Sequence, residues 1–137
     1  MQATVTRKTH FNAAHRLHNT RWDDETNRKV YGVCNNPNYH GHNYTLLAHV
    51  TGEINQETGF VLDLKILSEI LQKHVEEKLD HKNLNLDVPE FSDLVPTAEN
   101  IARVIWDIVR KQINSKYELK ITLYETENNW VEYNGQH

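Results

Sequence analysis

The chain is organised around one stretch, Cys34-Asn35-Asn36-Pro37-Asn38-Tyr39-His40-Gly41-His42-Asn43-Tyr44. It contains the only cysteine of the protein and two of its nine histidines. We predict a strand over residues 40–50. Because side chains alternate across a sheet, His40 and His42 would point to the same face. Two imidazoles about 6.6 Å apart along one strand can both reach a single metal ion.

A third metal ligand has to come from elsewhere in the chain. Residues 3–15 alternate in character, which predicts a long strand that ends at His15. Three histidine ligands with an open fourth position describe a catalytic zinc site, whereas a structural site normally has four protein ligands. Alone, the His-Gly-His pair is weak support, and Cys34 can equally be a small core residue. Their combination with His15 favours a zinc site.

Length and composition predict one domain over residues 1–137. The formal net charge is −4 and the Lys and Arg residues are scattered, which argues against nucleic acid as a partner. A single cysteine cannot form a disulfide within the chain. No apolar run is long enough for a membrane span, and the first residues do not form a secretory signal. We therefore expect a soluble, cytoplasmic protein with no membrane partner.

The rest of the chain predicts an α+β fold in the order β-β-α-α-β-β. Residues 19–33 are charged and predict a loop with one helical turn begun by Asp23 or Asp24, and residues 85–93 predict a second loop. Asp63 and Thr97 are predicted N-caps of two amphipathic helices, over residues 64–79 and 98–113. Alternation predicts two further strands, over residues 119–125 and 130–133. The result would be an antiparallel sheet with two helices on one face.

Several segments together resemble a known family. They are Phe11-Asn12-Ala13-Ala14-His15, the Cys-x5-His-Gly-His pattern from Cys34 to His42, Asp80-His81, Pro96-Thr97-Ala98-Glu99-Asn100 and Glu125. The chain is similar in these motifs to the 6-pyruvoyl-tetrahydropterin synthases and to the related 6-carboxytetrahydropterin synthases of the queuosine pathway. The resemblance implies the tunnelling fold, in which exposed sheet edges pair between subunits to close an oligomeric barrel. It also implies a homo-oligomer, usually a hexamer, with active sites between subunits.

The resemblance implies a reaction as well. The family's substrate is 7,8-dihydroneopterin triphosphate, whose side-chain hydroxyls can chelate Zn²⁺ bound by His15, His40 and His42. Polarisation of these hydroxyls by the metal acidifies the attached C–H bonds. The chain would then be a zinc-dependent lyase that forms 6-pyruvoyl-tetrahydropterin and releases triphosphate, without a nicotinamide or flavin.

Five further site residues follow from the resemblance, and all but Glu125 have a second interpretation. Cys34 would be the catalytic base, although it could instead be a fourth zinc ligand. Asp80 and His81 would form an assisting catalytic pair, although a histidine is also favourable at a helix C-terminus. Glu125 would accept two N–H bonds from the pterin, and Thr97 would contact the same ring, although it is also a good helix cap.

Four questions stay open at the level of sequence. The five residues between Cys34 and His40 favour the pyruvoyl product over the carboxy product of the queuosine enzyme, which releases acetaldehyde and triphosphate. A non-catalytic pterin- or metal-binding homologue is the alternative from another class. The triphosphate contacts and the role of residues 19–33 are also open, with four unranked candidates for the former: Arg16, Arg21, Arg28 and Lys82.

Overall fold

A computed structural model describes residues 1–136; the last residue of the predicted domain, 137, lies outside the described residues. One five-stranded sheet has the order β3-β1-β2-β4-β5. The strands are β1 (Gln2–His15), β2 (His40–Glu53), β3 (Lys82–Asn83), β4 (Glu118–Thr126) and β5 (Asn129–Tyr133). The expected sheet was antiparallel, and this is wrong at one edge, where β3 runs parallel to β1. The molecule is therefore α+β with a mixed sheet.

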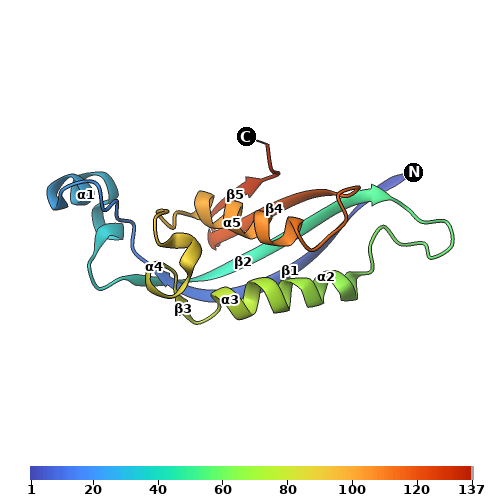
Figure 1. Ribbon diagram of the computed structural model, residues 1–137, viewed down its shortest axis with the longest axis horizontal. Helices are drawn as coiled ribbons and strands as arrows, with labels where there is room; N and C mark the ends of the chain where they lie inside the picture. Colours follow the sequence, from blue (N-terminus) through green and yellow to red (C-terminus); the bar gives the residue numbers. More distant parts are fainter. Residues whose placement is uncertain (137) are drawn as a thin grey trace.

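The predicted pairing of two long strands is confirmed and sets up the site. β1 and β2 pair antiparallel along their whole length, with His15 opposite His40 and Ala13 opposite His42. His40 and His42 share the face on which Tyr44 and the following alternate residues of β2 are fully buried. This register brings the end of β1 and the start of β2 together at one end of the elongated molecule (Figure 1).

The two predicted amphipathic helices are confirmed and cover one face of the sheet (Figure 1). The first runs through α2 (Leu64–Leu71), a π-helical turn η2 (Gln72–Glu76) and α3 (Glu77–Leu79), and the second is α5 (Ala98–Arg110). Asp63 and Thr97 cap them as expected, since each side chain accepts a bond from a backbone N–H of the first turn. Their buried Leu, Ile and Val side chains form the core with the inner face of β1, β2 and β4.

The two predicted loops contain more structure than expected. The segment after β1 forms α1 (Asp24–Tyr31), eight residues long and capped by Asp23, followed by a 3-10 turn η1 (Gly32–Asn35). Residues 85–93 are not a plain loop, because α4 (Leu84–Asp87) and the 3-10 turn η3 (Pro89–Phe91) occupy much of them. The Asn83 side chain accepts bonds from two backbone N–H groups of α4, which explains where that helix begins.

The other face of the sheet is polar. Threonine and histidine side chains pair across it, as in the Thr6–His49 contact of 2.9 Å and the His49–Thr122 contact of 2.8 Å. A search of residues 1–136 finds no helix that combines the length and the apolar character needed to cross a membrane.

Candidate active site

Three histidine rings meet where β1 ends and β2 begins. His15, His40 and His42 each place a ring nitrogen within 4.8 Å of the other two. The centroids of the rings lie 4.6 Å apart for His15 and His40, and 5.0 Å apart for each of the other two pairs. At this spacing, small rotations of the rings would bring all three nitrogens to a common ion at about 2.0–2.1 Å. The geometry therefore joins the three residues that the sequence predicts as ligands.

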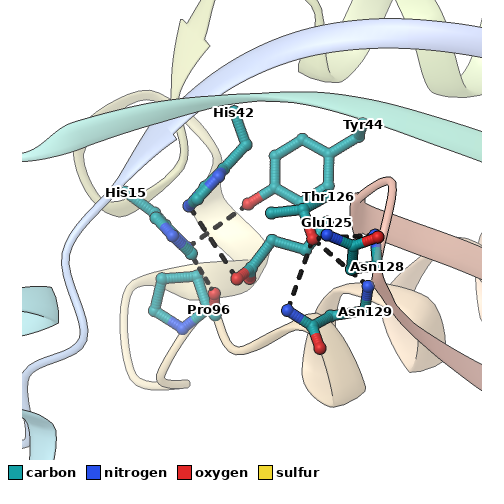
Figure 2. Close-up of polar contacts among 8 residues, drawn as sticks. All are labelled: His15, His42, Tyr44, Pro96, Glu125, Thr126, Asn128 and Asn129. Atoms are coloured by element: carbon teal, nitrogen blue, oxygen red, sulfur yellow. Dashed lines mark hydrogen bonds and ion pairs between the residues drawn. The ribbon is translucent and has the colours of Figure 1, made fainter.

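The free nitrogens of this cluster point to a ligand. His15 Nε2, His40 Nδ1 and His42 Nε2 are buried, and within residues 1–136 they have no hydrogen-bond partner. The Pro96 carbonyl oxygen can only accept, so its 2.7 Å contact makes His15 Nδ1 the protonated nitrogen (Figure 2). The lone pair of His15 then lies on Nε2, inside the cluster. Fixing the tautomer through the other ring nitrogen is how proteins orient metal-bound histidines.

Burial keeps His15 and His40 in their neutral, ligating form. His15 is 1% exposed, and this desolvation is the main cause that lowers its pKa from 6.5 to about 4. Desolvation and the neighbouring His42 lower the pKa of His40 as well. Because metal binding requires unprotonated imidazoles, both shifts favour a metal at neutral pH. Three neutral imidazoles and one remaining position suit zinc and its first-row neighbours.

Glu125 lies beside the cluster of His15, His40 and His42. In β4 it follows Tyr124, which pairs with Thr45 of β2. The distance from its Oε1 to His42 Nε2 is 3.9 Å, which is within ion-pair range but too long for a hydrogen bond (Figure 2). The carboxylate is partly exposed at 27%. Glu125 and His42 both line a cavity of about 770 Å³. A small molecule in that cavity could contact the carboxylate and approach the metal together.

Cys34 lies on the turn η1, which connects α1 to the start of β2 at His40, and it is half-buried. Its carbonyl oxygen accepts a 2.9 Å bond from Leu17 N, which attaches the turn to the segment that follows His15. Among residues 1–136, the group of possible ligands that lie within 4.8 Å of one another contains the three histidines and not Cys34. The structure therefore does not show Cys34 as a fourth ligand.

Asp80 and His81 contact each other, although neighbours in sequence need not. Asp80 Oδ2 is 3.0 Å from His81 Nδ1, and Asp80 Oδ1 accepts a 2.7 Å bond from Asn12 N. The Asn12 bond is the main cause that lowers the pKa of Asp80. His81 has a positive φ of 60°, unusual for a residue with a side chain, and donates its own N–H to Asn12 O at 2.6 Å. Backbone and carboxylate together orient this ring.

The structure joins the predicted site residues into groups. His81 lines a cavity of about 550 Å³ together with His42. Its side chain is 79% exposed, and within residues 1–136 no hydrogen bond links it to Cys34.

Thr97 caps α5 through Asn100 N at 3.2 Å, which confirms its structural interpretation. Sequence reasoning missed two residues that contact His15: Pro96, whose carbonyl orients the ring, and Tyr44, whose hydroxyl lies 3.4 Å from His15 Nδ1. The alternation that puts Tyr44 on the same face as His40 and His42 was the available signal for Tyr44.

Comparison with known proteins identifies the family. The model of the family described as 6-pyruvoyl tetrahydropterin synthase matches residues 4–136. The chain belongs to this family. The 6-pyruvoyl tetrahydrobiopterin synthase of Homo sapiens is 46% identical over 135 residues, which cover 98% of this chain and 93% of that protein. That of Drosophila melanogaster is 43% identical over 136 residues, covering 97% of this chain and 80% of that protein.

A solved structure agrees with the family assignment. The 6-pyruvoyl tetrahydropterin synthase of Caenorhabditis elegans superposes with a TM-score of 0.94 at 36% identity, covering 99% of this chain and 97% of that one. The resemblance seen in the sequence motifs is thus confirmed. The family and the names of the relatives support a pterin synthase, an enzyme of the lyase type.

Proposed function

We propose that the protein is a zinc-dependent lyase that converts 7,8-dihydroneopterin triphosphate to 6-pyruvoyl-tetrahydropterin and releases triphosphate. The proposal rests on three buried ring nitrogens that meet beside Glu125 and have no hydrogen-bond partner among the described residues 1–136. The reaction redistributes electrons within the substrate and expels triphosphate, so it needs no external oxidant or reductant. The names of the relatives favour the pyruvoyl product.

His15, His40 and His42 would hold the zinc ion, and the bound metal would polarise the two hydroxyls of the substrate side chain. Pro96 keeps His15 in the tautomer that can ligate. Burial keeps His15 unprotonated, because it lowers the pKa of that ring to about 4. The chain thus supplies His15 as a neutral, oriented ligand.

Cys34 is proposed as the base that removes a proton from carbon. Only a few per cent of a free thiol is ionised at pH 7, so such a base needs a neighbouring cation. His81 is the proposed partner, and Asp80 holds its Nδ1 in the way that a carboxylate orients the imidazole of other catalytic pairs. The thiol of Cys34 would hold the proton until it returns to the substrate.

Glu125 is proposed as the anchor of the pterin ring. A carboxylate can accept two parallel N–H bonds from the aminopyrimidine edge of a pterin. Its position 3.9 Å from His42 Nε2 supports this role, because a ring held there would lie next to the substrate side chain at the proposed metal. Thr97 is proposed to contact the ring from the start of α5, in addition to capping that helix.

A second copy of the chain is proposed to complete the site. No hydrogen bond within residues 1–136 links Cys34 to the exposed His81 ring. The polar sheet face and the edge strands β3 and β5 offer surfaces for closing a barrel between subunits. We propose a hexamer of single-domain subunits, each with the tunnelling fold.

Product analysis tests the proposed function. The purified protein, loaded with zinc, is incubated with 7,8-dihydroneopterin triphosphate, and the products are identified by mass spectrometry. We expect 6-pyruvoyl-tetrahydropterin and inorganic triphosphate. Formation of 6-carboxytetrahydropterin with acetaldehyde would assign the queuosine reaction instead, and unchanged substrate at saturating protein would show a non-catalytic homologue.

A further inference from the structure

A second cavity is lined by residues that adjoin the histidine cluster in the chain. Its volume is about 340 Å³, within the range of small-molecule sites, about 300–1,000 Å³. Three of its lining residues, Arg16, Tyr39 and Val95, are the immediate chain neighbours of His15, His40 and Pro96. Consecutive Cα atoms are only about 3.8 Å apart. A ligand held by the metal could therefore extend into this cavity.

Arg16 is fixed at the wall of the cavity. The Asn85 side chain accepts from Arg16 N at 2.8 Å and donates to Arg16 O at 2.9 Å, which holds the backbone on both sides. The Nε of Arg16 donates to Asn35 O at 2.9 Å. These bonds use Nε and leave the two terminal nitrogens of the guanidinium as donors. Such a pre-positioned fork is suited to bidentate binding of phosphate oxygens.

His18 offers a further donor to the same cavity. The Asn35 amide nitrogen, which is a donor only, donates to Leu17 O at 2.7 Å and lies 2.9 Å from His18 Nδ1. His18 Nδ1 must therefore accept, and the hydrogen of the neutral ring lies on Nε2. Asn35 is 3% exposed, so this tautomer is set by a buried amide.

Arg21 is the second cation of the lining. Its loop is attached to α1, because the fully buried Asn27 accepts from Asn19 N at 2.7 Å and donates to Asn19 O at 3.0 Å. Asn19 in turn accepts from Arg21 N at 2.9 Å. Within residues 1–136, no carboxylate lies within ion-pair distance of Arg16 or Arg21. Asp93 also lines the cavity, so the lining carries two positive charges and one negative.

We infer that this cavity, through Arg16, His18 and Arg21, binds the phosphate chain of the substrate. The inference rests on the proposed function, in which the metal holds the side-chain hydroxyls. The phosphate ester is on the carbon next to those hydroxyls, so the phosphates must lie close to the metal. Of the four basic residues left unranked by sequence, Arg16 and Arg21 line this cavity, whereas Arg28 and Lys82 do not. Residues 19–33 then serve to present Arg21.

The test uses inorganic triphosphate as the probe and titration calorimetry at low salt as the measurement. Arg21 is an exposed residue of the cavity lining, and Arg21→Gln removes its positive charge. We expect the affinity for triphosphate to fall about tenfold. Arg28→Gln, the matched change on α1, should bind as the wild type does. Asp93→Asn should bind severalfold more tightly, because it removes the negative charge of the lining.

The same variants are compared in turnover. Arg21→Gln should raise KM for the substrate about tenfold and leave kcat nearly unchanged, the pattern of binding energy shared by ground and transition states. Equal triphosphate affinity of Arg21→Gln and wild type would overturn the inference, as would absence of triphosphate binding by the wild type. A third contradicting result would come from a further variant, Lys82→Gln, if it lost affinity for triphosphate while Arg21→Gln did not. Turnover by the wild type, measured separately, tests the proposed function, so either can fail alone.

Discussion

At the scale of single residues, ring nitrogens decide what this protein can bind. The cluster combines a buried ring held by Pro96 with two rings from the start of β2. Buried polar atoms normally have a partner, so three together without one among residues 1–136 form a group that could hold a metal ion. His-x-His alternation and the end of a long strand allowed this set to be predicted. The Pro96 carbonyl could not be predicted, because it lies 81 positions from His15 and leaves no local signal.

The metal assignment predicts that His42→Ala loses zinc. The wild type should hold about one zinc ion per chain, and the variant should retain little, because two imidazoles leave the ion with too few protein ligands. Metal analysis of the purified proteins measures this. His10→Ala, at an exposed histidine of β1, is the control and should keep its zinc. Undiminished zinc in His42→Ala would rule out the assignment.

The anchor assignment predicts weaker pterin binding by Glu125→Gln. The substitution keeps the shape but replaces an acceptor oxygen by an amide donor. We expect the affinity for the substrate to fall by roughly 1.5–3 kcal/mol, the range for a hydrogen bond to a charged group. Fluorescence titration with a pterin measures it, and Glu127→Gln, at the exposed neighbour, is the control. Unchanged pterin binding by Glu125→Gln would show that Glu125 is a solvated surface charge and not the pterin anchor.

At the scale of elements, caps and pairing place the site. The alternation of β1 and β2 and the caps Asp63 and Thr97 were readable from sequence, because period and cap chemistry are local properties. β3 was not, since it has two residues and a strand that short has no period. α4 was missed for a related reason: its four residues depend on a cap by Asn83.

The cap of α5 predicts the effect of Thr97→Ala. The hydroxyl accepts from Asn100 N at 3.2 Å, and its loss should lower the free energy of unfolding by about 1 kcal/mol. Urea unfolding of the zinc-free protein measures this. Thr97→Ser, which keeps the hydroxyl, should restore most of the stability. Equal stability of Thr97→Ala and wild type would show that the cap contributes nothing.

At the scale of the whole molecule, burial against the core makes His15 and His40 resist protonation. Burial lowers the pKa of His15 from 6.5 to about 4 in the folded chain. Between these values the unfolded chain binds a proton that the folded chain does not, so acidification favours unfolding. Stability is therefore lost as the pH falls from 6.5 towards 4. The lowered pKa of His40 acts in the same direction.

This linkage predicts that the metal-free protein loses about 2 kcal/mol of stability between pH 7 and pH 5 through His15. Urea unfolding after chelator treatment measures it. The His15→Gln variant lacks the titrating ring and should lose markedly less stability over the same interval. An equal loss in the variant and the wild type would assign the pH dependence to other groups.

In the proposed mechanism, three histidines hold the metal and Cys34 moves the proton. Zinc content and single-turnover rate, measured on one sample of Cys34→Ala, test both roles together. We expect about one zinc ion per chain, as in the wild type, with turnover reduced by about 10²–10⁴-fold. Loss of zinc from Cys34→Ala would make the thiol a fourth ligand, and turnover equal to the wild type would contradict both assignments.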